Sequence, residues 1–449
     1  MGVLVPQSPS AAPFMPTALQ KFAGTTLALC LSLPTLCGQQ TWYVDPAGND
    51  RNGGQSPQDA FQSVSFAIQS ATAGDTIRLL PGTHAPFTLD RDGLVIEGFP
   101  IATVNAGNSP HAVHLDASQS HFSGASVLQY LNLESAGSGS VGIRISGNGK
   151  VSAYLQNLSL DGFAKGIEFS AVGASPPEDG LGGQLGGGSW GSGQGATFVG
   201  KSRLRILQCT FLGGDSGGQD LPTTAIELNT GRFRSFEGKI AGCWIEGYPL
   251  GIDVWGATTI SPRMENNDIL QVEMGLRLAV GKGRGGLGFD YLNGIQPVDR
   301  LRIHDNRIQF SGDGGGGELP SHAISLTSAG QHEVGGSIRD NDAFGFTKGI
   351  YFLGGDGGGL DLPAPMSTLI QNNVFHSGGG GGGDLPPESI GIHLEADDSM
   401  PLLGSVENND VEAFEVGTWV RGAFSATFFT NGNFYTDVVI EEVLEDTTP

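Results

Sequence analysis

Charge is scarce in this sequence, and positive charge is scarcest. Charged residues make up 15% of the 449 residues, against about 25% in an average globular protein. Asp and Glu number 46 and Lys and Arg 23, which gives a formal net charge of −23. A chain of this charge repels phosphate backbones and anionic lipid, so we expect neither nucleic acid nor a membrane surface as a partner.

Long apolar runs are also missing. The run Phe22–Cys37 follows Lys21 and is too short to cross a bilayer as a helix. A basic residue, an apolar centre and a small residue at the end, Gly38, are typical of a secretory signal peptide. We therefore predict that residues 1–38 are a signal peptide cleaved near Cys37–Gly38, and that the mature protein is exported to the periplasm, the cell surface or the medium. No later run is long enough for membrane insertion.

Cysteine is rare, whereas glycine is abundant. Two of the four cysteines lie in the signal segment, and the remaining pair, Cys209 and Cys243, excludes a disulfide-rich scaffold. Glycine accounts for 73 of the 449 residues, about twice its usual share of about 7%. No Gly-X-Y period is present, which excludes collagen.

A short repeat organises the second half of the chain. Its copies share an apolar residue, two variable residues, Asn, one variable residue and a second, mostly apolar residue. They are Met264–Ile269, Ile303–Ile308, Ile338–Ala343, Ile370–Phe375 and Val406–Val411. Where no insertion intervenes, a second strand begins eight residues after the Asn, as at Gly275–Leu278. Alternation of apolar residues and the glycine content exclude helical repeats.

A strand–turn–strand unit of this size cannot bury its own apolar face. Stacked copies bury it in a continuous solenoid core, with coils about 4.8 Å apart. We therefore predict an all-β solenoid with an internal ladder of hydrogen-bonded Asn side chains. The ladder residues are Asn267, Asn306, Asn341, Asn373 and Asn409. Cys209 and Cys243 take the same position in consecutive earlier coils, where parallel side-chain directions favour two buried thiols over a disulfide.

From Trp42 to the end, this repeat resembles the right-handed parallel β-helix of the pectin lyase-like superfamily. The opening Trp42–Asp50, followed by Gly74–Ile77 and Pro81–Thr83, is similar to the start of many secreted bacterial β-helix proteins, most of which have no assigned activity. The resemblance implies a right-handed solenoid, which we place at residues 75–440.

Caps are expected at both ends, because a terminal coil exposes core and a sheet edge. Ser56 and Pro57 are helix-start signals, and apolar residues then follow with helical spacing as far as Gly74. We predict a helix over residues 58–72 within an N-terminal strand-and-cap region, 39–74. A C-terminal plug is expected in Phe424–Leu444, with an acidic tail at 441–449.

Glycine-rich insertions interrupt the coils at two kinds of position. One kind precedes the second strand, and the other follows it. The insertions before the strand are 213–223, 311–321 and 377–388, and those after it are 171–197, 281–298 and 354–366. Loops on a rigid scaffold often carry binding residues, so we predict two loop walls flanking the sheet of second strands. Tolerated low-complexity growth is the alternative.

The outward residues of the second strands form the predicted floor of this groove. In chain order they are Arg144, Glu168, Glu227, Asp253, Arg277, Ser325, Tyr351, His393 and Trp419. The predicted substrate-binding residues are Arg277, Tyr351, His393 and Trp419. Flat rings in adjacent coils suit stacking against sugar faces, although ordinary cross-strand packing is the alternative.

Glu168, Glu227 and Asp253 are the candidate catalytic residues. Coil spacing puts neighbours about 5 Å apart and the outer two about 10 Å apart, which brackets the carboxylate separations of glycosidases. The same oxygens suit Ca²⁺, so calcium is the one cofactor considered. A surface charge ladder closed by Arg144 and Arg277 is the third interpretation.

Two further groups of residues, a second outward face and a set of histidines, each allow a functional and a purely structural interpretation. A second outward face carries Glu265, His304, Arg339, Gln371 and Glu407 beside Asp268, Arg307, Asp342 and Asp410. Its alternating signs favour ion-pair ladders over a lyase site. His111 and His114 are three residues apart and should point to opposite faces of a strand, which argues against a chelate with His121.

The superfamily's lyases use Lys or Arg as the base, and this resemblance draws attention to Lys165 and Lys348, which precede Gly-Ile turns. The Gly-His-Gly motif of polygalacturonases and the Asp-Pro-His-Glu motif of mannuronan epimerases are absent. Two hypotheses therefore stand. One is a secreted monomer that binds an extracellular polysaccharide, with cleavage as a lyase or glycoside hydrolase left open. The other is a non-catalytic cell-surface or matrix protein.

Overall fold

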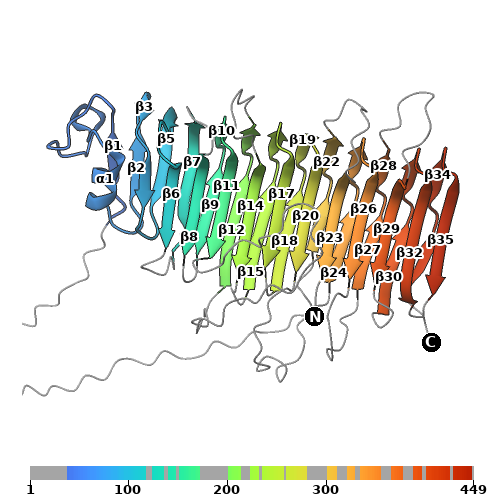
Figure 1. Ribbon diagram of the computed structural model, residues 1–449. Helices are drawn as coiled ribbons and strands as arrows, with labels where there is room; N and C mark the ends of the chain where they lie inside the picture. Colours follow the sequence, from blue (N-terminus) through green and yellow to red (C-terminus); the bar gives the residue numbers. More distant parts are fainter. Residues whose placement is uncertain are drawn as a thin grey trace, which may run out of the picture. The chain divides into compact units, whose positions relative to one another are not determined.

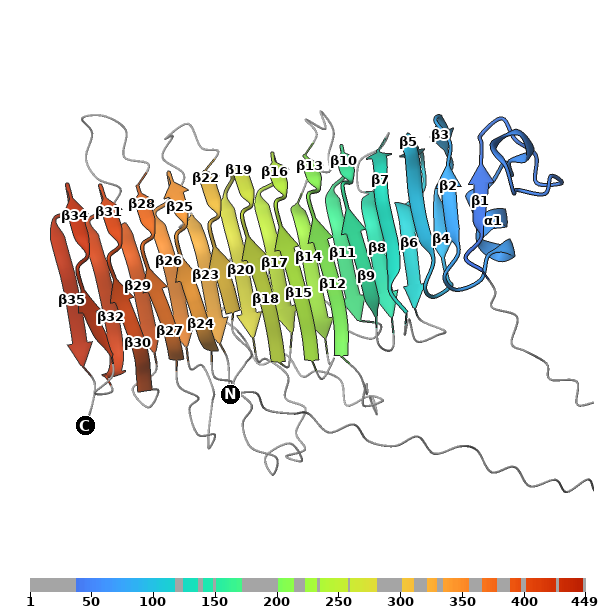
Figure 2. The ribbon, with the colours of Figure 1, turned by 180° about the vertical axis from the view of Figure 1, so that it is seen from behind.

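The repeat folds into coils of three short parallel strands, and each coil pairs with the next one along the chain. The computed structural model shows these coils side by side in sequence order from β1 to β35 (Figures 1 and 2). The predicted fold, an all-β right-handed parallel β-helix, is confirmed. Apart from Gly38, the described residues belong to the unit Gln39–Pro449, and residues 1–37 of the predicted signal peptide lie outside the described residues.

The structure describes most of the chain after residue 37. The described ranges are 38–117, 124–135, 140–147, 151–171, 201–213, 223–231, 235–256, 259–280, 301–310, 321–328, 334–354, 366–377, 388–396, 401–424 and 428–446. None of the helices in these ranges is long and apolar enough to cross a membrane.

Three parallel faces make up the solenoid, and we number them in the order in which a coil visits them. Face 1 consists of β1 (Thr41–Val44), β2 (Thr76–Leu79), β5 (Val95–Asn105), β7 (Ser126–Glu134), β9 (Ser152–Gln156), β12 (Lys201–Leu207), β15 (Ser235–Ala241), β18 (Thr259–Glu265), β21 (Leu301–His304), β24 (Val334–Arg339), β27 (Met366–Gln371), β30 (Pro401–Glu407) and β33 (Phe429–Asn431).

Face 2 is made of shorter strands, joined at its N-terminal end by the second halves of β5 and β7. Its own strands are β3 (Thr83–His84), β10 (Ser159–Asp161), β13 (Thr210–Leu212), β16 (Trp244–Glu246), β19 (Asp268–Val272), β22 (Arg307–Phe310), β25 (Asp342–Phe344), β28 (Val374–His376), β31 (Asp410–Glu412) and β34 (Phe434–Thr436).

Face 3 contains the second strands of the repeat. They are β4 (Phe87–Leu89), β6 (His111–Ala117), β8 (Val141–Gly147), β11 (Lys165–Ala171), β14 (Thr224–Gly231), β17 (Leu250–Gly256), β20 (Met274–Val280), β23 (His322–Ser328), β26 (Lys348–Gly354), β29 (Ile390–Ala396), β32 (Val416–Phe424) and β35 (Ile440–Asp446).

The Asn ladder stands at the turn from face 1 to face 2, as predicted. Each Asn donates from Nδ2 to the Oδ1 of the Asn in the next coil, at 2.8 Å for Asn267–Asn306 and 2.9 Å for each pair from Asn306 to Asn409. The residue before each ladder Asn has a positive φ, for example 56° at Asp340. Asp, Asn and Gly tolerate that conformation best, which explains the Asn-Asn and Asp-Asn pairs of the repeat.

The ladder extends beyond its predicted members in both directions. Asn409 donates to Asn433 Oδ1 at 3.0 Å, and the backbone N–H of Cys243 donates to Asn267 Oδ1 at 3.1 Å. Cys209 lies in the coil before Cys243, with Trp244 N donating to Cys209 O at 2.9 Å. Both cysteines are buried and free, so their predicted position is confirmed.

The N-terminal end is capped by a helix that is shorter than predicted. Pro57–Asp59 forms a 3-10 turn, η1, in which the Ser56 side chain makes no capping bond. The helix α1 covers Val64–Ser70, and Ser63 caps it by accepting from Phe66 N. Val64, Ala67 and Ile68 are buried under the first coils. The predicted start near residue 58 was therefore wrong, because the capping Ser is the later one.

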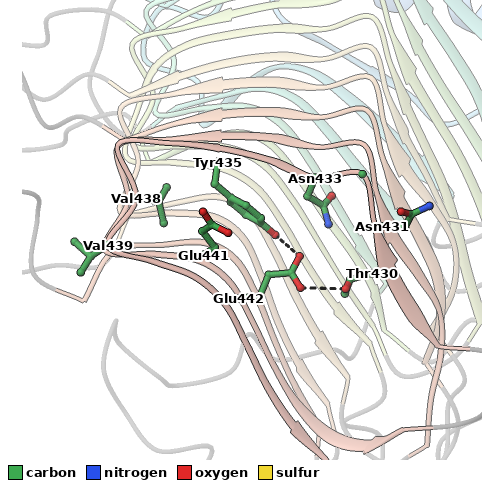
Figure 3. A pocket seen from close by; sticks show the side chains of 9 residues that line it. Thr430, Asn431, Asn433, Tyr435, Val438, Val439, Glu441 and Glu442 are labelled. Atoms are coloured by element: carbon green, nitrogen blue, oxygen red, sulfur yellow. Dashed lines mark hydrogen bonds between the residues drawn. The ribbon is translucent and has the colours of Figure 1, made fainter.

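The C-terminal end carries a last coil in place of the predicted plug. Residues 429–446 form β33, β34 and β35, so most of the predicted acidic tail is a face 3 strand. Glu442 follows buried Ile392 and Thr418 in one core column. Its carboxylate accepts from Tyr435 Oη at 2.8 Å and Thr430 Oγ1 at 3.1 Å, at the edge of a shallow pocket (Figure 3). A polar final coil suits an end that meets water.

Candidate functional site

The outward residues of face 3 stand in the predicted order. Strand pairing aligns the row from Arg144 through Glu168, Glu227, Asp253, Arg277, Ser325, Tyr351 and His393 to Trp419. The row continues to His114 and Thr88 at one end and to Val443 at the other. Each strand contributes one member, so neighbours are one coil apart.

A break in alternation brings a second row to the same surface. After the first residue of strands such as β6 and β26, two consecutive residues point inward, as Gly349 and Ile350 do, so Lys348 and Tyr351 both face outward. Glycine is required there because a Cβ on Gly349 would lie 2.5 Å from Gly391 O. Residues three apart therefore share the outer surface of face 3.

This geometry corrects the interpretation of the histidine pair. The rings of His111 and His114 lie 4.9 Å apart, on the same face, where simple alternation had placed them on opposite faces. His114 Nε2 lies 2.7 Å from Ser146 Oγ. Within the described ranges, no group of three or more His, Cys, Asp and Glu side chains is arranged to hold a metal ion, and His121 lies outside those ranges.

The three candidate catalytic acids are engaged with cations. Glu168 contacts Arg144 at 2.9 Å and Lys165 at 3.2 Å, and Lys165 Nζ also reaches Glu227 Oε2 at 2.6 Å. The geometry thus favours the ion-pair ladder among the three interpretations of this trio. The catalytic and calcium-binding roles stay predictions.

Asp253 and Arg277 form the tightest of these pairs. Arg277 donates to both carboxylate oxygens, at 2.9 and 2.5 Å, and Asp253 is 3% exposed. The carboxylate raises the pKa of Arg277, partly offset by burial. Because Arg277 is held by this pair, a contact between its guanidinium and a substrate stays a prediction.

An aromatic cluster occupies the next coils of the same surface. The His322 ring stacks on Tyr351 with centroids 4.8 Å apart and planes at 16°. Tyr351 meets His393 edge-on at 5.1 Å, and His393 lies 4.4 Å from Trp419. His393 is 4% exposed, whereas Tyr351 and Trp419 are half-buried and keep surface open to solvent. We call these four residues and Lys348 the ring cluster.

Lys348 connects the members of the ring cluster. Its Nζ lies 4.4 Å from the Tyr351 ring centroid and 3.2 Å from His393 Nδ1. On the other side, His393 Nε2 lies 3.6 Å from Glu395 Oε2. Sequence reasoning found Tyr351, His393 and Trp419 but missed His322, because its row was not recognised as outward. The signal was available in the Lys348–Tyr351 spacing of three, which His322 and Ser325 share.

Burial changes the proton affinities within the ring cluster. Desolvation, aided by the charge of Lys348, lowers the pKa of His322 to about 4 and that of His393 to about 3. Desolvation also lowers the pKa of Lys348, opposed by Glu388 and Glu395, and raises the pKa of Tyr351. Both imidazoles are therefore neutral at neutral pH.

Acidification is expected to destabilise the fold through these histidines. An unfolded His binds a proton near pH 6.5, but folded His322 does so only near pH 4. Between these values the unfolded state carries more protons, so stability falls as the pH falls. His322 alone should remove about 3 kcal/mol by pH 4. Urea unfolding across this range should show a smaller pH dependence for His322→Gln than for wild type. Ser325→Ala, which keeps both histidines, should retain the wild-type slope, and an unchanged slope in His322→Gln would contradict the assignment.

The insertions predicted to wall the groove lie almost wholly outside the described residues. The described residues on either side of each insertion show only which strands the insertion connects. Insertions 213–223, 311–321 and 377–388 enter face 3 strands from face 2, and 171–197, 281–298 and 354–366 leave face 3 strands for face 1. The loop walls stay a prediction.

The second predicted outward row lies on face 1 in the expected order, Glu265, His304, Arg339, Gln371 and Glu407. Glu265 pairs with Lys239 at 2.9 Å, and His304 Nε2 lies 2.6 Å from Ser337 Oγ. Burial and Arg339 lower the pKa of His304. These contacts favour the ion-pair interpretation over a lyase site. Asp268, Arg307, Asp342 and Asp410 are likewise aligned on face 2, with Val374 between the last two.

Comparison with known proteins finds distantly similar solved structures but no relative in sequence. No family model and no curated protein matches the chain. Similar solved structures include the GH136 lacto-N-biosidase from Eubacterium ramulus, at 10% identity over 91% of this chain and 68% of that chain, with a TM-score of 0.40. The family 28 exopolygalacturonase from Yersinia enterocolitica has 9% identity over 91% and 78%, with a TM-score of 0.38. Pectate lyase Pel9A has 15% identity over 88% and 79%, with a TM-score of 0.35. At these values the likeness concerns the fold alone.

Proposed function

We propose that this protein is exported and binds an extracellular polysaccharide, as a monomer, on the outer surface of face 3. The observation that carries the proposal is the ring cluster. Half-buried Trp419 keeps ring surface open to the apolar C–H patches of sugars, and half-buried Tyr351, whose ring stacks on His322 and lies under Lys348, keeps part of its surface exposed nearby. Buried His393 fixes both rings in place. Lys348 and Glu395 lie beside them as hydrogen-bonding partners for hydroxyl groups.

The packing of the Tyr351 and Trp419 rings favours a ligand-binding role over a purely structural one. Both rings are ordered by His393, so little side-chain entropy is lost when a ligand stacks on them. Tyr351 and Trp419 lie two coils apart, with His393 in the coil between them. A coil advances about 4.8 Å, so two coils span about 10 Å, a distance comparable with two sugar residues of an extended chain. A glycan lying along the solenoid axis would therefore meet the two rings with every second sugar.

Trp419→Ala is expected to weaken polysaccharide binding about tenfold, because it removes one stacking surface. Affinity electrophoresis against a panel of soluble polysaccharides would identify a ligand and measure the change. Trp244→Ala is the matched control, because Trp244 is 40% exposed but lies on face 2. Equal retardation of both variants and wild type would reject this site. Failure of every polysaccharide to retard wild type would instead favour the non-catalytic structural role.

Cleavage of the bound glycan is a second candidate function, favoured by one observation. The lowered pKa of the half-buried Lys348 amine makes it a better proton acceptor at neutral pH, and it contacts His393 and Tyr351. These groups suit proton abstraction from a sugar carbon, the first step of elimination. Hydrolysis through the acid trio is tested separately by Glu227→Gln, which should abolish reducing-end release while sparing binding if Glu227 is catalytic.

A further inference from the structure

A row of basic residues crosses the outer surface of face 1. Strand pairing aligns Arg205 with Lys239, Lys239 with Arg263 and Arg263 with Arg302. These four residues occupy the same position in four consecutive coils, β12, β15, β18 and β21. We call them the basic row. It spans three coil steps, about 14 Å.

Further cations border the basic row. Arg203 lies two residues before Arg205 on β12, and Arg339 lies on β24, one coil beyond Arg302. With Lys201, the first residue of β12, seven of the chain's 23 basic residues are on five adjacent strands, although the net charge is −23; the other six form or border the basic row. The charge composition alone would not predict such a concentration.

Carboxylates pair with three of these six cations. Glu265 pairs with Lys239 at 2.9 Å, Glu237 lies 3.4 Å from Arg203, and Asp340 lies 3.7 Å from Arg339. Arg205 and Arg263 are exposed, and Arg205 lies 5.1 Å from the Tyr154 ring centroid. In the part of the chain that the structure describes, neither Arg263 nor Arg302 forms an ion pair.

Like charges directly opposite each other on paired strands destabilise a sheet. The basic row places three such contacts in succession, from Arg205 to Arg302, so it works against the stability of the fold. On face 3, by contrast, the charges neutralise one another: the consecutive acids Glu168, Glu227 and Asp253 are paired with Arg144, Lys165 and Arg277. A bound anionic chain would turn this repulsion into attraction.

We propose that the basic row is a second binding site, which holds a linear acidic polysaccharide along the solenoid axis. The guanidinium groups of Arg205, Arg263 and Arg302 would each grip a carboxylate or sulfate group in a two-pronged hydrogen bond. One cation per coil matches a polymer with about one charge per sugar. Double-stranded DNA carries a charge every ~1.7 Å along its axis, a density that a protein of net charge −23 repels.

This site is distinct from the ring cluster, because it lies on face 1 and the cluster on face 3. The inference does not depend on the proposed function: a non-catalytic surface protein would use the basic row equally well. The two proposals fail separately, since each has variants that leave the other surface intact.

Affinity electrophoresis of the full chain in gels containing polygalacturonate would test the basic row. Wild type should be retarded relative to a gel containing neutral dextran, and added salt should remove the effect. Arg263→Gln with Arg302→Gln should weaken the apparent affinity about tenfold, as expected for the loss of two charge contacts, one exposed and one half-buried. The charge-matched control is Arg51→Gln with Arg307→Gln, two exposed arginines away from the basic row. The control should behave as wild type.

Three outcomes would overturn the proposal. Equal retardation of both double variants would show that the basic row is not the contact surface. No retardation of wild type by polygalacturonate, alginate or a sulfated glycan would show that acidic polysaccharides are not the ligand. Stronger retardation by single-stranded DNA than by any acidic glycan, lost in the Arg263 and Arg302 variant, would assign the surface to a nucleic acid.

Discussion

Replacing Asn341 with leucine is expected to lower the free energy of unfolding by about 4 kcal/mol. Asn341 is 1% exposed and stands in the middle of the ladder. Its Oδ1 accepts from the backbone N–H and from Nδ2 of Asn306, and its Nδ2 donates to Ile303 O and Asn373 Oδ1. Leucine fills a similar volume but leaves several of these groups buried without partners, at about 1–3 kcal/mol each. Urea unfolding measures the change.

Asn433→Leu supplies the comparison for this prediction. Asn433 accepts from Asn409 in the same way, but it is half-buried in the final coil, where water can replace the lost bonds. The loss there should be about 1 kcal/mol. Equal losses at both positions would show that the ladder contributes through packing and not through buried hydrogen bonding.

Lys348→Met is expected to lower the rate of any eliminative cleavage by about 100-fold or more, the usual contribution of a general base. Methionine keeps much of the apolar stem over the Tyr351 ring but cannot accept a proton. Glycan binding through the rings should persist in this variant. Appearance of unsaturated products from a panel of polysaccharides, with and without Ca²⁺, measures the rate.

Lys165→Met is the matched control, because Lys165 holds the equivalent position four coils before the ring cluster begins at His322. Its carboxylate partners Glu227 and Glu168 outweigh burial and raise its pKa, so it is a poor base. The control should cleave as wild type does. Absence of products with wild type would reject the lyase role and leave binding as the function. Equal loss in both lysine variants would point to a structural cause.

Most of the fold could be predicted from local patterns. The Asn repeat gave the coil, the ladder and the order of the outward row from Arg144 to Trp419, because strand pairing repeats the same offset in every coil. The ladder's last member was missed because Thr430 replaces the apolar residue that opens the pattern. The helix start was misplaced because two serines, Ser56 and Ser63, both precede helical signals.

The candidate site was predicted less completely. Alternation correctly pointed Tyr351, His393 and Trp419 outward, but it hid the row that includes His322 and His111. In strands such as β26, two consecutive inward residues follow the first residue, and the first of them, Gly349, packs closely against the next coil. The resulting spacing of three between outward residues is present in the sequence, but the contact that causes it joins residues of different coils.

The sequence by itself determined the all-β solenoid, its coil boundaries and the identity of its stacked residues, because each depends on a periodicity of side-chain burial. Tertiary structure decided which of the stacked charges form ion pairs. Lys165 reaches across a coil to Glu227 and also pairs with Glu168, while Arg263 and Arg302 form no ion pair with any residue that the structure describes. Ion pairing depends on side chains meeting between coils within about 4 Å, and insertions of variable length conceal those meetings from the linear order of the chain.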